Sequence, residues 1–351
     1  MPLATPPTVL TIAGSDSGGA AGLAADLRTF AAYGVHGALA VAAVTVQDTV
    51  GVKAVEVLPA RLLAAQIEAV AADLHPAAAK TGYLGSPANA AAVSALAAYG
   101  ALPNLVLDPV LVSSSGTPLF PGRDMVEATR VLLASAVVAT PNLPEAALLL
   151  GWDQGSPGSR GRPGSRGGSG SRGGPGGPGA AGSTASAGST AGPGVRQAGG
   201  LDDLDAAETA ARKLQALGPA LVVVTGGRHR AGAEAVDVAF DGVAVTYLSA
   251  PFVDTPNVHG TGDSLSAALA AGLALGWGPL EAALVAKAFV HDALVRSATW
   301  HLGAGHGPID HLDLAARRSE RQQARTSDAG DAARASGGQD LDEDGSDRGA
   351  P

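Results

Sequence analysis

The sequence predicts a three-layer α/β/α fold whose central sheet is mainly parallel. Short apolar runs alternate with Ala- and Leu-rich helical patterns in the manner of β-α-β units, and polar or glycine-rich turns follow several of the runs. After two low-complexity segments are set aside, 265 of the 351 residues remain, at 1–151 and 201–314. One sizeable α/β domain fits that length, and its ligands should collect at the carboxyl ends of the strands.

The elements follow in chain order from apolar periodicity. A buried strand at 9–13 leads into the loop GSDSGGAAG and then into a helix whose Leu23, Leu27 and Phe30 recur at i, i+4 and i+7. Further strands are expected at 37–44, 77–80, 105–107, 136–139 and 221–224, and the clearest helices at 60–73 and 87–98. Apolar runs at 236–240 and 243–247 flank Asp241-Gly242, which predicts an antiparallel hairpin.

Two segments are predicted to be disordered. Residues 152–200 hold 18 of the 49 glycines and almost no large apolar side chain, so they cannot bury enough surface to offset the entropy lost on ordering. Residues 315–351 form an acidic tail, with seven acidic and two basic side chains from Asp328 onward. We therefore expect a single domain at 1–314 that is interrupted by the insert and followed by the tail.

Charge and composition argue against several classes of partner. The net charge is −9, of which the tail accounts for about half, so neither nucleic acid nor an anionic membrane is expected as a partner. The uncharged run at 264–280 is interrupted by glycines and a proline, so it predicts a buried helix and a turn rather than a membrane span. Because the sequence has no cysteine and no basic region before its first apolar stretch, we expect a cytoplasmic protein.

The stretch DTPNVHGTGDSLSAA at 254–268 predicts an anion-binding turn at the start of a helix. Gly260 and Gly262 can adopt backbone angles that other residues resist, so the amides around Thr261 can point into one concavity. Asp263 would lie at its edge, where it can take a proton from an alcohol while the amides bind a phosphoryl group in transfer. The alternative is a capped helix, with Thr261 as N-cap and Asp263 in the first turn.

Other polar residues follow predicted strands. Asp108 and Glu145 are candidate ligands for Mg²⁺, because a magnesium–nucleotide site needs only one or two carboxylates besides the substrate phosphates. Thr225-Gly226-Gly227 would bring the backbone close to a nucleotide. The alternative is that the two carboxylates are helix-cap or turn residues and that the glycines form a plain turn. Because no Walker A motif occurs, phosphates would have to bind at the helix-terminus turn.

Six sequence blocks carry a resemblance to a known family. In chain order they are TIAGSDSGGAAGLAADLRTFAAYGVHG, AVTVQDTVGV, LDPVLVSSSG, TPNLPEAALLLG, HGTGDSLSAALAAGLALG and GHGPIDH, and together they cover nearly all of the core. They resemble the ribokinase superfamily and, within it, the hydroxymethylpyrimidine/phosphomethylpyrimidine kinases of thiamine biosynthesis. The resemblance implies a ribokinase-like fold, ATP as co-substrate, Mg²⁺ as cofactor and a homodimer.

The resemblance also implies which residues bind the substrates. The implied pyrimidine site consists of Gly14, Asp26, Gln47, Tyr83 and Val110, and the implied ATP site of Asn142, Thr225 and Gly227. Asp26 can accept a hydrogen bond from an exocyclic amine, and Gln47 offers both a donor and an acceptor to the aminopyrimidine edge. Without the resemblance, Asp26 would be interpreted as a helix-face carboxylate and Gln47 as a loop-capping amide.

The chain departs from many relatives at three residues and in its insert. Asp263 stands where many relatives have cysteine, and aspartate is the general base of the wider superfamily, which favours phosphoryl transfer. Thr225 and Ser114 stand where lysines are common, so cations that would meet ATP phosphates are missing. Arg228 or Arg230, together with Mg²⁺, could compensate. The insert is expected beside the nucleotide entrance.

These observations lead to one functional hypothesis and three alternatives. The hypothesis is ATP- and Mg²⁺-dependent phosphorylation of 4-amino-5-hydroxymethyl-2-methylpyrimidine and then of its monophosphate. Asp263 would be the base in the first step, whereas the second step would depend more on the amides of Gly260, Thr261 and Gly262. The alternatives are a pyridoxal kinase, a sugar kinase of the same superfamily, and a non-catalytic protein that binds the pyrimidine.

Overall fold

The computed structural model describes residues 5–112, 119–120, 123–152, 201–229 and 234–320. The strands are β1 (Thr8–Gly14), β2 (His36–Asp48), β3 (Gly51–Val57), β4 (Ala78–Thr81), β5 (Val106–Leu107), β6 (Val138–Ala139), β7 (Leu221–His229), β8 (Glu234–Phe240) and β9 (Val245–Pro251). The helices are α1 (Gly22–Ala32), α2 (Ala60–Leu74), α3 (Pro87–Ala98), α4 (Asp124–Leu132), the 3₁₀ turn η1 (Leu133–Ser135), α5 (Leu143–Leu150), α6 (Leu201–Gln215), α7 (Thr261–Ala274) and α8 (Pro279–Ser297).

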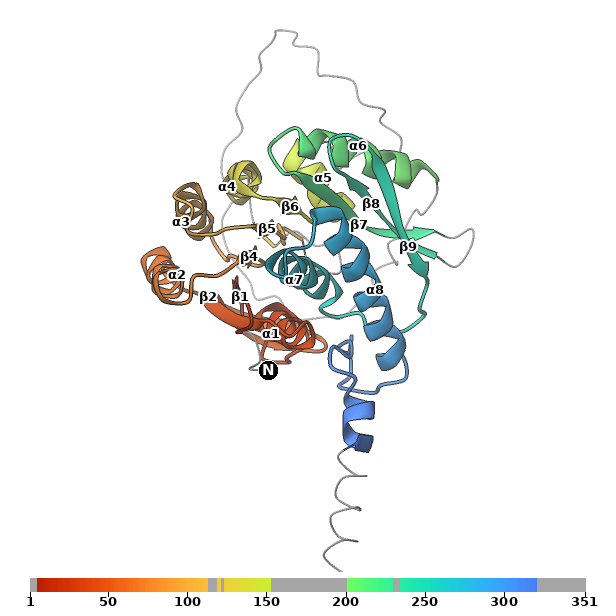
Figure 1. Ribbon diagram of the computed structural model, residues 1–351. Helices are drawn as coiled ribbons and strands as arrows, with labels where there is room; N and C mark the ends of the chain where they lie inside the picture. The colour runs from red at the N-terminus through yellow and green to blue at the C-terminus, as the bar shows by residue number, and fades with distance from the viewer. Residues whose placement is uncertain (1–4, 113–118, 121–122, 153–200, 230–233, 321–351) are drawn as a thin grey trace, which may run out of the picture.

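The strands form one sheet in the order β3-β2-β1-β4-β5-β6-β7-β8-β9. Neighbouring strands from β2 to β7 in this order are parallel, whereas β3 at one edge and β8 and β9 at the other pair antiparallel with their neighbours. Helices cover both faces of the sheet (Figure 1). The predicted three-layer α/β/α fold with a mainly parallel sheet is therefore confirmed.

Alternate residues of each strand face opposite helix layers, because the side-chain period of a strand is two. Leu10 packs with the layer of α2 to α6, and Val9 packs with the layer of α1, α7 and α8 (Figure 1). The same alternation directs Lys80 to the side of Ala78, which is the side of α1 and α7. The polar residues of this layer therefore converge on the N-terminal turn of α7.

Most predicted elements are confirmed, and α3 coincides with the predicted helix at 87–98. The hairpin predicted at Asp241-Gly242 is formed by β8 and β9, with Gly242 at a φ of 91°. The antiparallel β3 lies outside the predictions. It forms because Asp48 Oδ1 accepts hydrogen bonds from the amides of Val50 and Gly51 at 3.0 and 3.2 Å, which reverses the chain after β2.

The segment predicted as a disordered tail from residue 315 begins with helix, because residues 314–320 are helical. Asp313 Oδ1 accepts from the Ala316 amide at 3.3 Å and so acts as a side-chain cap for these residues. Outside the described residues lie 153–200 of the predicted insert, 321–351 of the predicted tail, Ser114, Arg230 and the side chain of Arg228. Among the helices of the described ranges, none is long and apolar enough to cross a membrane.

Candidate active site

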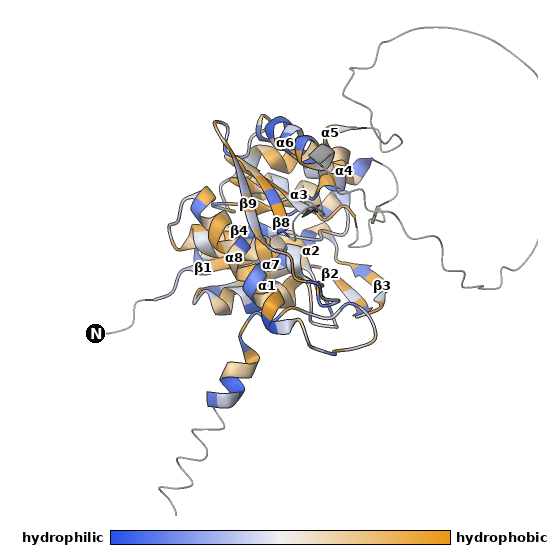
Figure 2. Cartoon of the chain, turned by 90° about the vertical axis from the view of Figure 1, so that its right-hand side faces the viewer, coloured by the Kyte–Doolittle hydropathy of each residue, from blue (hydrophilic) through white to orange (hydrophobic). Residues whose placement is uncertain are grey.

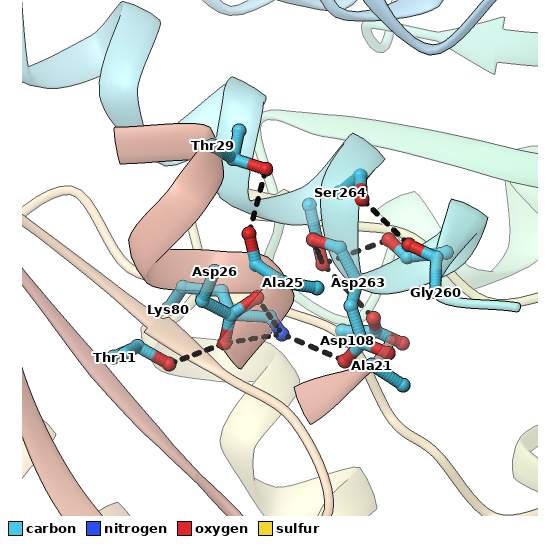
Figure 3. Close-up of polar contacts among 12 residues, drawn as sticks. Thr11, Ala21, Ala25, Asp26, Thr29, Lys80, Asp108, Gly260, Asp263 and Ser264 are labelled. Carbon is cyan, nitrogen blue, oxygen red and sulfur yellow. Dashed lines mark hydrogen bonds and ion pairs between the residues drawn. The ribbon is translucent and has the colours of Figure 1, made fainter. Parts of the chain in front are cut away.

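A buried lysine lies at the centre of the site (Figure 3). Lys80 of β4 is fully buried, and its Nζ donates to Asp26 Oδ1 at 2.9 Å and to Asp26 Oδ2 at 3.0 Å. The same Nζ lies 3.2 Å from Asp263 Oδ1 in the first turn of α7. Burial opposes the charge on Lys80, but the carboxylates of Asp26, Asp263 and Asp108 outweigh it, so the pKa of Lys80 is raised. A fixed cation therefore lies beside the Asp263 carboxylate.

Asp26 occupies a different position from the one expected of a pyrimidine ligand. It has no exposed surface, and Thr11 Oγ1 donates to its Oδ2 at 2.6 Å while Lys80 uses both oxygens. Burial raises the pKa of Asp26 to about 6, against the opposing effect of Lys80. The reason for this placement is helical spacing, because Leu23, Asp26 and Phe30 lie on the same buried face of α1. A direct contact between Asp26 and a substrate does not fit this geometry.

The N-terminal turn of α7 begins at a glycine that no other residue could replace without displacement. Gly260 is the N-cap at a φ of 86°, and a Cβ placed on it would lie 1.9 Å from the carbonyl oxygen of Ala20. The alternative that Thr261 is the N-cap is therefore wrong. The Thr261 amide donates to Val258 O at 3.4 Å, whereas the next amides, those of Gly262 and Asp263, begin the helix and have no intrahelical acceptor.

The loop between β1 and α1 is tightened by one carboxylate. Asp16 is buried, its Oδ1 accepts from the Gly18 amide at 2.8 Å, and its Oδ2 accepts from the amides of Ala20 and Ala21 at 2.8 Å each. These contacts fix the carbonyl of Ala20 against Gly260. The first glycine-rich loop and the anion-binding turn therefore form one packed unit.

The block GHGPIDH, which ends at His311, contacts the first turn of α7. Ser264 Oγ donates to Gly260 O at 2.6 Å and lies 2.7 Å from Nε2 of the buried His311. Farther upstream in this region, the amides of Ala304 and Gly305 donate to Thr49 Oγ1, each at 3.1 Å. The C-terminal part of the core thus contacts both the β2–β3 turn and the first turn of α7.

The buried state of His311 predicts a specific acid sensitivity. Burial, assisted by the charge of Arg28, lowers the pKa of His311 to about 4, so the folded protein keeps this ring neutral where an unfolded chain would charge it. The resulting stabilisation is complete above pH about 6.5 and is lost as the pH falls towards 4, at about 3 kcal/mol in total. We expect His311→Gln to flatten the fall in the free energy of unfolding between these pH values, as measured by urea denaturation.

His306→Gln is the control for this experiment, because His306 is exposed and should leave the pH dependence as it is in the wild type. Parallel pH profiles for the wild type and His311→Gln would show that His311 does not contribute to acid unfolding.

Asp108 and Glu145, the predicted magnesium ligands, both lie in buried positions. Ser266 Oγ donates to Asp108 Oδ2 at 2.9 Å, and burial raises the pKa of Asp108 to about 8, with Asp263 and Glu145 adding to the effect. Glu145 Oε2 accepts from the Asn142 amide at 3.0 Å, and its Oε1 accepts from the Leu111 amide at 3.0 Å. Glu145 therefore has the helix-capping contacts of the alternative reading, and burial also raises its pKa.

Within the described residues there is no group of three or more His, Cys, Asp or Glu side chains arranged to hold a metal ion. The donor set of Asp108 and Glu145 nevertheless suits a hard cation, because a magnesium–nucleotide site takes only one or two protein carboxylates. Burial and neighbouring negative charge both disfavour the ionised form of Asp108, and a nearby divalent cation would relieve this.

The residues predicted to contact ATP lie together, Asn142 just after β6 and Thr225 and Gly227 in the middle of β7. Asn142 and Thr225 form a parallel bridge, and the Thr225 amide donates to Pro141 O at 2.9 Å. Asn142 is the N-cap of α5, since its Oδ1 accepts from the Glu145 amide at 2.9 Å. Gly227 follows on β7 after a shift in register and pairs with β8.

The turn in β7 is anchored from β8 and α8. Gly226 donates its amide to Asp237 Oδ1 at 3.1 Å, and Lys287 Nζ donates to Asp237 Oδ2 at 2.8 Å. Asp237 is buried, so this ion pair holds the backbone of the turn in place.

The remaining residues predicted for the pyrimidine lie at the ends of β1, β2 and β4 and after β5. A Cβ placed on Gly14 would lie 3.2 Å from Tyr83 Cδ1, and the Tyr83 ring stacks on Phe120 with centroids 5.5 Å apart. Val110 has a φ of 38°, which is strained for a β-branched residue. Gln47, at the end of β2, lies with its Nε2 2.8 Å from His259 Nε2.

Three residues of the site had no predicted role. Lys80 carries a charge in the otherwise apolar strand sequence AAAKT, a signal that could have marked it, because lysine is rarely buried unless it is paired. Asp16 follows a strand and precedes two glycines, which is typical of a side chain that bonds loop amides. His259 directly precedes the anion-binding turn, but nothing local in the sequence indicates its contact with Gln47.

Comparison with known proteins places this chain in a family. The sequence model described as phosphomethylpyrimidine kinase matches residues 16–159 and 197–310. The chain is 38% identical over 306 residues to the hydroxymethylpyrimidine/phosphomethylpyrimidine kinase of Rhizobium meliloti, which covers 86% of this chain and 96% of the relative. It is 37% identical to the protein of that name from Mycobacterium tuberculosis, covering 88% of this chain and 94% of the relative.

The solved structures that resemble this chain include proteins named pyridoxal kinase and a protein named phosphomethylpyrimidine kinase. A pyridoxal kinase of Bacillus subtilis in complex with ADP superposes with a TM-score of 0.68 at 30% identity, covering 88% of this chain and 98% of that one. A phosphomethylpyrimidine kinase of Clostridium difficile gives a TM-score of 0.58 at 30% identity, covering 82% and 99%. From the family match and the near-complete coverage of its curated relatives, this chain belongs to the phosphomethylpyrimidine kinase family.

Proposed function

We propose that this chain phosphorylates 4-amino-5-hydroxymethyl-2-methylpyrimidine with ATP and then phosphorylates the monophosphate to the diphosphate, in thiamine diphosphate biosynthesis. The observation that carries the proposal is the position of Asp263, whose carboxylate lies in the first turn of α7 beside the Lys80 cation, in a chain of this family. The names of the curated relatives support the choice of substrate. The activity is proposed for the cytoplasm, in keeping with a sequence that has no cysteine.

In the first step, Asp263 takes the proton of the hydroxymethyl group, and the oxygen bonds to the γ-phosphorus of ATP as the bond to ADP breaks. Lys80 stays protonated because its pKa is raised, so it orients Asp263 and is not itself the base. The amides that begin α7 hold the negative charge of the group in transfer.

The second step uses the same turn but needs the base less. The nucleophile is now the phosphate of the monophosphate, which carries little proton near neutral pH. Its transfer chemistry depends on charge stabilisation by the amides at the start of α7, of which those of Gly262 and Asp263 have no acceptor within the helix, and less on proton removal by Asp263. This difference between the steps makes the role of Asp263 measurable.

We assign the pyrimidine to the space bordered by Gly14, Tyr83, Val110 and Gln47. The strained φ of Val110 supports this, because backbone strain is concentrated at functional sites. Asp26 is left out of this set; it acts through Lys80, whose ammonium it pairs.

ATP is proposed to bind over Asn142, Thr225 and Gly227, next to the carboxylates that would hold Mg²⁺. Solved structures named pyridoxal kinase contain ADP or AMP-PCP, which supports a nucleotide site in this fold. Asp108 and Glu145 would hold the metal directly or through water. When bound, the ion supplies neutralisation of phosphate charge.

Pyridoxal phosphorylation is the second candidate function. It is favoured by the TM-scores of the solved pyridoxal kinases, one of which is a Staphylococcus aureus structure with AMP-PCP and pyridoxal at 0.66 and 27% identity. Pyridoxal also presents a hydroxymethyl group on a nitrogen heterocycle, so Asp263 could serve it in the same way.

Mass spectrometry of the purified protein with ATP and Mg²⁺ tests the function. Mono- and diphosphorylated pyrimidine should both appear, at a higher kcat/KM than phosphorylated pyridoxal or ribose measured side by side. Turnover of pyridoxal alone would replace the proposal with the second candidate. Binding of the pyrimidine without any product would indicate a non-catalytic binding protein.

We also propose that the chain forms a homodimer through the β2–β3 hairpin. Val46, Val50 and Val52 are 56%, 73% and 53% exposed, and β3 forms an edge of the sheet (Figure 2). Neighbouring exposed apolar side chains on an edge strand favour association with another protein surface, and a second copy presents the same one.

Val46→Glu is expected to weaken the dimer by about 30-fold or more, because burying a new charge at the centre of an apolar contact costs about 2 kcal/mol. Sedimentation velocity over a range of protein concentrations measures the change. Val131→Glu is the control, since Val131 is 61% exposed on α4, away from the hairpin. A wild-type protein that stays monomeric, or a Val46→Glu variant that dimerises as well as the wild type, would contradict the proposed interface.

A further inference from the structure

His259, the residue before Gly260, contacts the side-chain amide of Gln47, which is proposed to bind the pyrimidine. His259 and Gln47 are 212 residues apart in the sequence, and their side-chain Nε2 atoms lie 2.8 Å apart. His259 is bound on its other side through its backbone amide, which donates to Gly307 O at 3.1 Å. His259 is thus held between the C-terminal part of the core, through its backbone, and the end of β2, through its ring.

The chemistry of this contact assigns the proton on the histidine. The Nε2 of Gln47 carries two hydrogens and can only donate, so a hydrogen bond at this contact has His259 Nε2 as its acceptor and places the ring hydrogen on Nδ1. The other neighbour of His259 Nε2 is Asp16 Oδ2 at 3.6 Å, which is beyond hydrogen-bond distance. Asp16 Oδ2 already accepts from the amides of Ala20 and Ala21.

The main chain of Gln47 is fixed as well, so its orientation toward a ligand is set by its side-chain contacts. Ser17 Oγ donates to the backbone carbonyl oxygen of Gln47 at 2.7 Å and accepts from the backbone N–H of Gln47 at 2.8 Å. Thr45 Oγ1 donates to Ser15 O at 2.8 Å and lies 3.5 Å from Gln47 Oε1, so it holds that oxygen only weakly. The contact with His259 is therefore the main determinant of which side of Gln47 carries the oxygen.

We propose that His259 is a positioning residue that locks the Gln47 amide in one orientation and thereby selects an aminopyrimidine over pyridoxal; the inference rests on the proposed function. One hydrogen of Gln47 Nε2 is used by His259, which leaves one donor and the Oε1 acceptor side by side. An exocyclic amine next to a ring nitrogen presents the complementary acceptor–donor pair. The corresponding edge of pyridoxal carries an aldehyde oxygen and a phenolic oxygen. In the phenolate form both of these oxygens are acceptors, so pyridoxal offers no donor to Oε1 of Gln47.

Kinetics with both substrates under saturating ATP and Mg²⁺ test the inference. His259→Leu removes the acceptor and should raise the KM for the aminopyrimidine about tenfold, as expected for one net hydrogen bond, with kcat and the KM for pyridoxal changing less than about twofold. His259→Asn keeps an acceptor oxygen and should recover most of the loss. His306→Leu is the matched control, because the exposed His306 lies in the neighbouring C-terminal segment.

A double-mutant cycle separates positioning from general disturbance of the site. In the Gln47→Ala background, His259→Leu should have no further effect on the KM for the aminopyrimidine. Additive effects in the cycle, or equal losses for the aminopyrimidine and pyridoxal, would overturn the inference.

A measurement on the wild type covers the case in which His259→Leu fails to fold. The ¹⁵N chemical shifts of the histidine rings should show Nε2 of His259 without a hydrogen at pH 8, and a ring protonated at Nε2 would overturn the inference. Wild-type protein that neither binds nor phosphorylates the aminopyrimidine would refute the proposed function and this inference with it. If the wild type phosphorylates the aminopyrimidine but His259→Leu changes the KM for the aminopyrimidine and for pyridoxal equally, only this inference would be refuted and the proposed function would stand.

Discussion

Asp263→Asn is expected to reduce phosphorylation of the hydroxymethyl group by about 10²- to 10⁴-fold, while phosphorylation of the monophosphate falls much less. The amide keeps the shape of the side chain but cannot take the proton of an alcohol. The fold should survive, because Lys80 retains its two contacts with Asp26. Single-turnover measurements give the ratio of the wild-type rate to the variant rate for each step. Thermal unfolding checks that the variant is folded.

Asp292→Asn is the matched control, because Asp292 is an exposed aspartate of α8 outside the site and should leave both steps unaffected. An equal loss in both steps for Asp263→Asn would show that Asp263 acts on charge or orientation in general and not as the base of the first step.

Gly260→Ala is expected to abolish both steps, with losses of at least about 10²-fold in each. The added Cβ would lie 1.9 Å from Ala20 O, and that carbonyl is held by the loop that Asp16 tightens, so the α7 turn itself must move. Its amides would then no longer point at the group in transfer. Because both steps use this turn, the pattern should differ from that of Asp263→Asn. Initial rates of the two phosphorylation steps measure the loss in each.

The effect of the backbone angle alone can be separated from the effect of the clash. Gly276 has a φ of 88°, nearly that of Gly260, but a Cβ placed there meets nothing within 4 Å. Gly276→Ala should therefore cost only about 1 kcal/mol of stability and leave both rates intact. Near-normal rates for Gly260→Ala would mean that the amides of this turn do not hold the phosphoryl group.

The fold was largely predictable because its signals are local. The apolar period of each element and the turn at Asp241-Gly242 depend on residues close in sequence, and they correspond to the observed strands and helices. β3 lacked such a signal, since its residues from Gly51 to Glu56 are exposed and show no alternation of apolar and polar burial. An edge strand of this kind is specified by its turn and its neighbour rather than by its own pattern.

The site was only partly predictable, because its central contacts join distant residues. Lys80 and Asp263 are 183 residues apart, and no local pattern links them. The position of Asp26 could have been read from helical spacing, since Leu23 and Phe30 already mark the buried face of α1. The resemblance directed attention to a substrate contact instead, although an isolated carboxylate on a buried helix face requires a partner inside the protein.

The contacts made by residues 304–311 have a consequence for biosynthesis of the protein. Thr49 and Ser264 receive their partners from a segment that leaves the ribosome after every strand of the sheet. The sheet and most of the helices can form during translation, but the first turn of α7 is expected to reach its final shape only once residue 311 has emerged. Nascent chains and products truncated before that residue are therefore expected to be folded in part and inactive.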